Sequence, residues 1–243
     1  SLRHDGIGDG MTYVSGDRLV FTDDLIVSVK QHVGDDRTIC DTARVSTLGD
    51  IADVVVKSEE DNAKLIRYLM KNKHGSPFEH GLITYIVTAP IFMFWDHVRH
   101  RIGVSYNIES SRYKDLEPRF FVASDARTQT GKPGHYKMSP GSPEQTAAMH
   151  DDQMTACYRA WEMYQSQLQQ RIAREQAMQI LPMNTIITGY VTVNPRSLMH
   201  FLELRLGPAR QEMQRIARLY MAPFRLYWPE TAAAFEEAGM IAP

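Results

Sequence analysis

The segment Arg99-His100-Arg101-Ile102-Gly103-Val104-Ser105-Tyr106-Asn107-Ile108-Glu109-Ser110-Ser111-Arg112-Tyr113 gathers three arginines, several hydroxyls, an amide and a carboxylate. It follows the apolar run 91–98, so its first cations stand where a helix should end, and the helix dipole favours cations there. Arginine binds phosphate through two parallel hydrogen bonds. The segment therefore predicts a surface for a phosphorylated, planar ligand with many hydrogen-bonding groups. The alternative is a solvated basic loop.

The run before this segment predicts a helix over 91–101, opened by Pro90. The helix is apolar on nearly every face, so we expect it to be buried. It would then carry Asp96, Arg99, His100 and Arg101 into the interior. Buried charges must be paired or bind a ligand. Asp96 and Arg99 are three residues apart and could pair with each other.

A second polar loop, HGSPFEH, spans residues 74–80. It places two histidines, a hydroxyl and a glutamate around a proline. A metal site is one interpretation, but the spacing differs from the i, i+4 pair of a helical zinc motif, and we expect no metal. The other interpretation is that the histidines cap backbone carbonyls.

The remaining pattern predicts one α/β (α+β) domain over residues 25–243, with a mixed central sheet flanked by helices. We expect residues 1–24 to form an irregular arm. Residues 114–143, rich in Gly and Pro, are predicted to be a long functional loop or lid. Strands are predicted at 25–33 (an edge strand), 82–88 and 185–193, and helices at 35–46, 59–73, 196–206 and 211–224. A further long helix carries the core stripe Met154, Cys157, Trp161, Tyr164, Leu168 and Ile172.

Composition excludes several classes of protein. A net charge of −2 argues against a nucleic-acid-binding or membrane-surface protein. The two cysteines, Cys40 and Cys157, are too few for a disulfide framework, which indicates a reducing compartment. No apolar run is long enough to span a membrane. We therefore expect a cytoplasmic protein.

Asn194 and Pro195 form an N-cap and first-turn pair that opens the helix 196–206, on which Arg196 and His200 share a face. With this helix, the 74–80 loop and the Arg-His-Arg triplet in order, the chain resembles the flavin-dependent thymidylate synthases (ThyX). The segments that carry the resemblance are RHR at 99–101, SYNIESSRY at 105–113, HGSPFEH at 74–80 and VNPRSLMHFLELR at 193–205.

The resemblance implies a homotetramer of α/β subunits with active sites where subunits meet. It implies that reduced FAD, recharged by NADPH, acts with 5,10-methylenetetrahydrofolate to methylate C5 of a uracil nucleotide. By position it assigns cofactor binding to Ser46, His74, Ser76, Glu79, Arg99, His100, Arg101, Asn107, Asn194, Arg196 and His200. It assigns nucleotide binding to Asp96, Arg99, Glu109, Ser110, Ser111, Arg112, Met178 and Arg205. Ser46, as an isolated serine, is equally suited to be a cap.

Arg205 is the expected catalytic residue. An arginine beside N3 of the uracil ring would stabilise the anion that makes C5 electron-rich. A cysteine-dependent synthase would attack C6 with a thiolate, but neither cysteine has an activating setting in the sequence. Reduced flavin must then supply the hydride. Ser110 has no adjacent base, so phosphate contact is favoured over nucleophilic attack.

Four positions depart from the family pattern. One residue is inserted after the triplet, Ile108 replaces a Glu, Asp96 stands where Gln is usual, and Met178 stands where a nucleotide-binding Arg is common. Loss of that Arg removes a charge-assisted hydrogen bond worth roughly 1.5–3 kcal/mol. We infer that the cofactor chemistry is kept and that the selection of the nucleotide is altered. The substrate would be UMP, dUMP or both, which would fit a C5-methylation step in nucleoside-antibiotic assembly. The alternatives are an ordinary dUMP-specific synthase and a degenerate homologue that binds nucleotide or flavin without catalysis.

Overall fold

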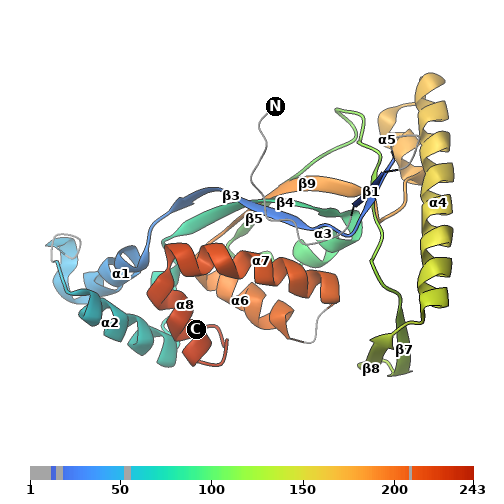
Figure 1. Cartoon of the computed structure of the whole chain (residues 1–243). Helices are drawn as coiled ribbons and strands as arrows, with labels where there is room; N and C mark the ends of the chain where they lie inside the picture. The colour runs from blue at the N-terminus through green and yellow to red at the C-terminus, as the bar shows by residue number, and fades with distance from the viewer. Residues whose placement is uncertain (1–11, 15–18, 52–55, 208–209) are drawn as a thin grey trace.

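The computed structural model describes residues 12–14, 19–51, 56–207 and 210–243. Its centre is a four-stranded antiparallel sheet in the order β3-β4-β9-β5 (Figure 1). The strands are β3 (Ile26–Val33), β4 (Leu82–Pro90), β9 (Ile186–Val193) and β5 (Val104–Ile108). The three predicted strands are confirmed, and β3 lies at an edge as expected. β5, inside the polar segment 99–113, was not predicted.

Alternation along β5 gives the sheet two different faces. Val104, Tyr106 and Ile108 pack toward the hydrophobic core, whereas Ser105 and Asn107 are exposed. The same outward face carries two cross-strand hydroxyl pairs, Thr84 with Thr192 at 2.9 Å and Thr88 with Thr188 at 3.0 Å. Neighbouring residues of one strand therefore reach opposite sides of the sheet.

Three helices cover the apolar face, below the sheet in Figure 1: α6 (Pro195–Leu206), α7 (Gln211–Tyr227) and α8 (Pro229–Glu237). Tyr85 of β4 stacks on Tyr220 of α7 with ring centroids 4.1 Å apart, and both rings are buried. Beside them lie α1 (Asp36–Leu48) and α2 (Glu59–Lys71), capped by Asp35 and Ser58. The helices predicted in these regions are confirmed.

The long helix α4 (Pro143–Gln169) stands across one end of the sheet (Figure 1). Its Cys157 is buried in a second cluster with Leu19, Phe21, Phe120 and Val122, so the packing role expected for Cys157 is confirmed. Ile172 lies beyond the end of the helix and is exposed, unlike the rest of the predicted stripe.

The N-terminal region is more ordered than the expected irregular arm. β1 (Thr12–Val14) pairs with β2 (Val20–Thr22), and β2 pairs in parallel with β6 (Arg119–Phe121). This small sheet forms because Phe21, beside Phe120, supplies apolar surface that packs against α4. Residues 1–11 and 15–18 lie outside the described part of the chain.

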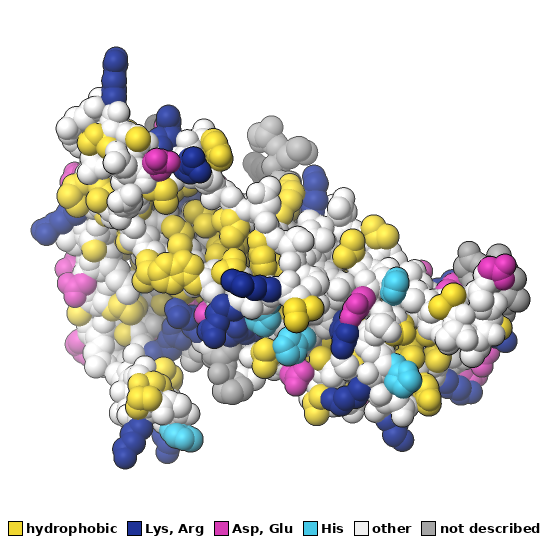
Figure 2. Space-filling view, turned by 180° about the vertical axis from the view of Figure 1, so that it is seen from behind, with side chains coloured by type: hydrophobic (Ala, Val, Ile, Leu, Met, Phe, Trp, Pro, Cys, Tyr) yellow, Lys and Arg dark blue, Asp and Glu magenta, His cyan; other side chains and the backbone are white. Residues whose placement is uncertain are grey.

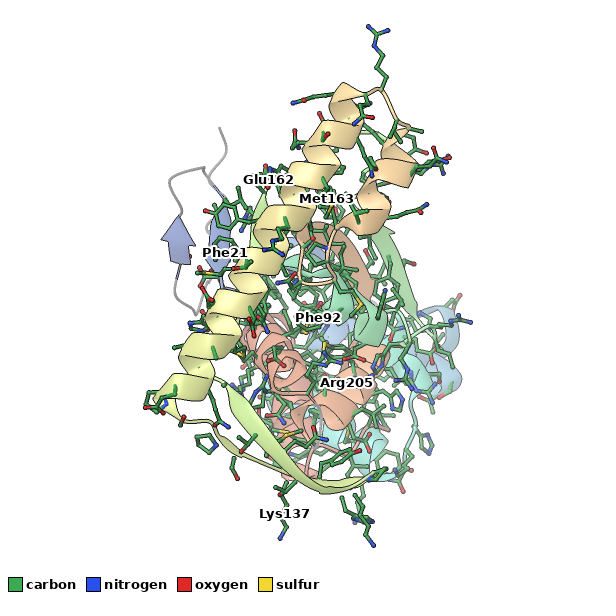
Figure 3. All side chains as sticks on the ribbon, turned by 90° about the vertical axis from the view of Figure 1, so that its right-hand side faces the viewer. Phe21, Phe92, Lys137, Glu162, Met163 and Arg205 are labelled. Atoms are coloured by element: carbon green, nitrogen blue, oxygen red, sulfur yellow. The ribbon has the colours of Figure 1, made fainter. Side chains whose placement is uncertain are left out.

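The prediction of one long loop over 114–143 is also wrong in part. Besides β6, this segment contains a hairpin formed by β7 (Arg127–Lys132) and β8 (His135–Pro140). Gly131 and Gly134, which both have positive φ, lie at the turn of this hairpin, and in the sequence they indicate a loop. β7 carries no apolar side chain, and in β8 the apolar Tyr136 and Met138, which alternate with polar residues, are exposed, so the pattern marks no buried face. Arg127 anchors the hairpin to buried Glu212 of α7, and Lys137 lies toward its outer end (Figure 3).

The helix predicted over 91–101 is shorter and less buried than expected. α3 spans Ile91–His97, Trp95 is 57% exposed, and Arg99 and Arg101 lie on the surface. Only His97, 2% exposed, brings a titratable ring into the interior. The expected pair of Asp96 with Arg99 is not formed, because Asp96 pairs with Arg210 at 3.4 Å.

The remaining elements are short. They are the 3-10 turns η1 (Gly49–Ile51), η2 (Ser76–Glu79) and η3 (Met178–Ile180), and the helix α5 (Arg174–Ala177). None of the helices in the described ranges has the length and apolar character that crossing a membrane requires.

Candidate functional site

A cleft of about 790 Å³ lies between the turn after α3 and helix α6. On the face shown in Figure 2, cationic side chains and histidine rings gather beside a hollow lined by hydrophobic side chains. The residues lining the cleft are Glu79, Arg99, His100, Arg101, Ile102, Gly103, Val104, Asn194, Arg196, Ser197, His200, Glu203, Leu204, Arg205, Ala242 and Pro243. Eight of the sequence-predicted site residues therefore meet in one place.

The start of α6 and the turn at Gly103 form one wall. The Asn194 side chain accepts a hydrogen bond from the Ser197 backbone N–H at 2.8 Å, which caps the helix. Gly103 has φ +65°, and a Cβ there would clash with the side chains of Ser197 and Asn194. Only glycine lets this turn lie directly against the helix N-terminus.

Arg205 and His100 form the centre of the cleft. Arg205 Nε donates to His100 Nε2 at 3.0 Å, so that nitrogen is the unprotonated acceptor and His100 is neutral in this contact. Partial burial, together with the charges of Arg205 and His200, lowers the pKa of His100 to about 4. The second contact of Arg205, from Nη2 to the Asp96 carbonyl, is 3.4 Å long.

The carboxylates of the cleft are already engaged. Glu79 pairs with Arg196 at 2.5 Å, and a Cβ on Gly75 would clash with the same guanidinium. Glu203 accepts a hydrogen bond from the Ala242 N–H at 3.0 Å. Among the residues that the structure describes, no carboxylate pairs with Arg99 or Arg101, which leaves the cleft with a positive field suited to an anion.

Two of the predicted cofactor residues lie next to the cleft without lining it. His74 lies just before η2 and Ser76 begins it, and both are exposed; the His74 ring is tilted against Tyr68 with centroids 5.9 Å apart. Ser46 lies on α1, where its hydroxyl donates to the Ala43 carbonyl at 3.0 Å. The roles of these three residues toward a cofactor stay predictions.

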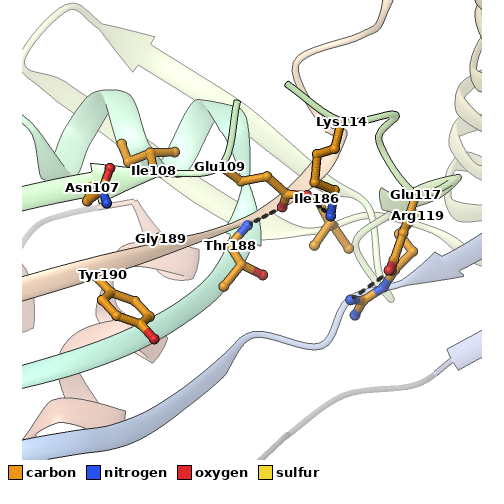
Figure 4. Close-up of a pocket in the computed structure, with 10 residues that line it drawn as sticks. All are labelled: Asn107, Ile108, Glu109, Lys114, Glu117, Arg119, Ile186, Thr188, Gly189 and Tyr190. Atoms are coloured by element: carbon orange, nitrogen blue, oxygen red, sulfur yellow. Dashed lines mark hydrogen bonds and ion pairs between the residues drawn. The ribbon is translucent and has the colours of Figure 1, made fainter. Parts of the chain in front are cut away.

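A second hollow, of about 420 Å³, holds Asn107 and Glu109 (Figure 4). It lies on the outward face of the sheet, because Asn107 alternates with the inward Tyr106. Glu109 accepts from the Thr188 N–H at 3.0 Å and pairs with Lys114 at 2.6 Å. The structure thus separates Asn107 and Glu109 from the residues around Arg205 within one chain.

The predicted phosphate-binding residues follow this hollow along the chain. Ser111 is buried, and its hydroxyl donates to the sulfur of Met178. Arg112 pairs with Glu175 at 3.2 Å, and its backbone N–H donates to the Ser110 hydroxyl at 3.3 Å. Met178 and the 110–112 segment, which are far apart in sequence, therefore lie together, and their roles toward a nucleotide stay predictions.

Neither cysteine is set up as a nucleophile. Burial raises the pKa of Cys40 to about 12 and raises the pKa of Cys157. A protonated, buried thiol does not attack a pyrimidine ring. Within the described residues no group of three or more His, Cys, Asp or Glu side chains is arranged to hold a metal ion.

Sequence reasoning missed several residues that shape the cleft, among them Gly103, Ser197, Glu203 and Tyr106 behind it. Gly103 had a usable signal, since a glycine two residues after an arginine cluster indicates a tight turn. Tyr106 had a weaker one, the alternation Val104, Tyr106, Ile108, which is typical of a strand with one buried face.

Known proteins are similar to this chain over most of its length. Residues 28–230 match the family described as thymidylate synthase complementing protein. The chain is 40% identical over 234 residues to a flavin-dependent thymidylate synthase of Tropheryma whipplei, covering 92% of this chain and 97% of that protein. It is 37% identical over 246 residues to the Streptomyces coelicolor flavin-dependent thymidylate synthase, covering 96% of this chain and all (100%) of the relative.

Two similar solved structures are of the UMP/dUMP methylase PolB from Streptomyces cacaoi. The form bound with 5-Br dUMP superposes with a TM-score of 0.83 at 33% identity, covering 91% of this chain and 98% of that one. The form bound with 5-Br UMP gives 0.82 at 35% identity, covering 92% and 99%. The mixed α/β domain is thus a ThyX-like fold. The chain belongs to the flavin-dependent thymidylate synthase family and is a methyltransferase of that type.

Proposed function

We propose that this enzyme methylates C5 of UMP, dUMP or both, with FAD as cofactor, 5,10-methylenetetrahydrofolate as carbon donor and NADPH as reductant. The observation that carries the proposal is the contact of Arg205 with a neutral His100 inside a cationic cleft. Support also comes from the two PolB structures, since that protein is a methylase bound with analogues of both nucleotides.

The cleft suits FAD by its donor set. Arg99, Arg101 and Arg196 supply guanidinium donors for a pyrophosphate, and His200 is an exposed ring on the same helix face as Arg196. At Gly103 the backbone approaches α6 so closely that any side chain would fill the wall. When bound and reduced, FAD supplies the hydride that completes the methyl group.

Arg205 is the residue we assign to activation of the pyrimidine. A guanidinium has five N–H donors, and within the described ranges Arg205 donates to two protein groups, His100 and the Asp96 carbonyl. The remaining donors are available to a uracil ring in the cleft. They would stabilise negative charge spread over N3 and its carbonyls, which makes C5 nucleophilic.

In this proposal Ser110, Ser111 and Arg112 bind the nucleotide phosphate. Met178 beside Ser111 offers no charge to that phosphate. Asp96 is neutralised by Arg210, so its carboxylate repels an anion less than an unpaired one would. A site with fewer fixed contacts to dUMP is consistent with acceptance of UMP, and with a role in specialised nucleoside metabolism such as antibiotic assembly.

We further propose a homotetramer whose active sites form between subunits. Around the cleft, Trp95, Ile102 and Leu204 are 57%, 89% and 48% exposed. A contiguous exposed apolar patch is typical of a contact surface, and these side chains would contribute to one. Within one chain Arg205, assigned to the pyrimidine, lines the cleft, whereas Ser110, Ser111 and Arg112, assigned to the nucleotide phosphate, do not, and an assembly could bring the two groups together.

The test is direct. Purified protein should carry an FAD absorption spectrum that NADPH bleaches, and addition of 5,10-methylenetetrahydrofolate with dUMP should give thymidylate. Bound flavin without turnover would favour the degenerate homologue, which binds but does not catalyse. Absence of both flavin and nucleotide binding would overturn the proposal.

A further inference from the structure

A tyrosine lies behind the arginine turn without lining the cleft. Tyr106, on the inward face of β5, shares its one hydroxyl proton between two backbone carbonyl oxygens, those of His97 at 2.6 Å and His100 at 2.9 Å. The carbonyl at the end of a short helix lacks an intrahelical partner, and here the phenol supplies it. The His100 N–H also donates to the His97 carbonyl, at 3.0 Å. The turn between α3 and β5 is thus closed from inside by one hydroxyl.

The position of this turn determines where the His100 ring lies. The ring packs edge-on against Phe201 with centroids 4.8 Å apart, and its Nε2 accepts from Arg205 Nε. Arg205 comes from the last turn of α6, so its contact with His100 joins two separate elements. A shift of the turn would break that contact.

The surroundings leave the turn little freedom. His97 is buried, stacks on Phe201 at 4.9 Å and faces the Tyr220 hydroxyl at 3.0 Å. The cavity enclosed by His97, His100, Tyr106 and Tyr220 is about 10 Å³, room for no more than a single water. Burial raises the pKa of Tyr106 above its ordinary value, so the phenol stays a hydrogen-bond donor.

We propose that Tyr106 is a positioning residue for the methyl transfer: by holding the carbonyls of His97 and His100, it keeps the His100 ring in place to accept from Arg205, and so directs the guanidinium into the cleft. The inference rests on the proposed role of Arg205, and Tyr106 acts on the reaction only through His100.

The variant Tyr106→Phe removes the hydroxyl and keeps the ring in the core. The first readout is NMR titration of the His100 ring in the ligand-free protein. The charged and titratable groups that act on this ring are Arg205, His200, Arg99 and Asp96. Release of the turn exposes the ring to water and weakens the Arg205 contact, so we expect the pKa of His100 to rise by about one unit toward its ordinary value.

The second readout is kinetic. Misplacement of a catalytic group by about 1 Å can cost up to about a hundredfold in rate, so we expect kcat to fall by about ten- to a hundredfold with little change in KM for the nucleotide. Tyr136→Phe, on the exposed strand β8, is the matched control. Tyr220→Phe removes a neighbouring buried hydroxyl but leaves both contacts of Tyr106, and should leave the His100 titration unchanged.

An unchanged His100 titration in Tyr106→Phe overturns the proposal. An equal change in Tyr220→Phe also overturns it, because the effect would then be general loosening of the core. A shifted titration with unchanged kcat would support the positioning of His100 by Tyr106 and would contradict the role given to Arg205. The two ideas therefore fail in different experiments.

Discussion

The Ser111 hydroxyl donates a hydrogen bond to the Met178 sulfur, joining the segment after β5 to the turn η3. This contact places Met178 beside the residues assigned to the nucleotide phosphate. A thioether is a weak acceptor and carries no charge, so it contributes little to anion binding. The same position filled by arginine would face a phosphate held at Ser111.

Met178→Arg should therefore raise affinity for the nucleotide. A charge-assisted hydrogen bond is worth about 1.5–3 kcal/mol, so we expect the Kd for dUMP to fall by about tenfold or more in calorimetric titration. Met183→Arg, at a residue that is already 52% exposed and lines another hollow, is the control. Equal affinity of the Met178 variant and the parent protein would remove Met178 from the nucleotide site.

Arg205→Ala should abolish methylation while FAD stays bound, because the guanidinium acts on the pyrimidine. Removal of one donor that stabilises developing charge costs about a hundred- to a thousandfold in kcat. Turnover is measured with saturating nucleotide, and bound flavin by its absorbance. Arg218→Ala, at an exposed position of α7, controls for loss of a surface arginine. Retained turnover in Arg205→Ala would exclude it from the mechanism.

Gly103→Ala should weaken FAD binding. The new Cβ would clash with the side chains of Ser197 and Asn194, and the residue would be strained at φ +65°. Gly134→Ala is a matched control, because φ there is +81° but nothing lies within 4 Å of the added Cβ. Fluorescence titration of both apoproteins with FAD compares them. If the two variants bind FAD equally well, the wall at Gly103 is not part of the flavin site.

Stability should fall as the pH drops below about 6.5. Burial lowers the pKa of His97 to about 3 and that of His100 to about 4, whereas both rings titrate near 6.5 in the unfolded chain. Below pH 6.5 the unfolded state binds protons that the folded state does not, so the free energy of unfolding decreases toward pH 4. Each unit of pKa difference corresponds to about 1.4 kcal/mol at full effect.

Urea unfolding at a series of pH values measures this slope. His97→Phe, which removes the deepest ring, should flatten the slope between pH 6.5 and 4, whatever its effect on stability at neutral pH. An identical slope in this variant and the parent would contradict neutral burial of His97.

The parts of the fold that follow from periodicity could be predicted from the sequence. Strands β3, β4 and β9 are rich in β-branched residues, and α6 has a cap, a first-turn proline and two same-face cations. These signals are local, so they can be recognised without knowledge of the tertiary contacts. The sequence also predicted that the Arg-His-Arg triplet would lie near Arg196, His200 and Arg205, because all of these positions belong to the family motifs.

What could not be predicted depends on tertiary contacts. α3 ends at His97, where the Tyr106 hydroxyl, from the next strand, donates to the His97 carbonyl that a longer helix would have used. Asp96 pairs with Arg210, which lies 114 positions later in the chain, and not with Arg99, which is only three positions away. The separation of Asn107 from the Arg205 cleft follows from the pleat of β5, which was not recognised as a strand.

We expect the site to accept UMP as well as dUMP. The FAD-loaded enzyme is incubated with 5,10-methylenetetrahydrofolate and NADPH and with UMP or dUMP in parallel, and the product masses are compared. We expect a product heavier by one CH₂ unit from UMP as well as from dUMP. Methylation of dUMP alone, with UMP unchanged at the same enzyme concentration, would contradict the claim and leave an ordinary thymidylate synthase.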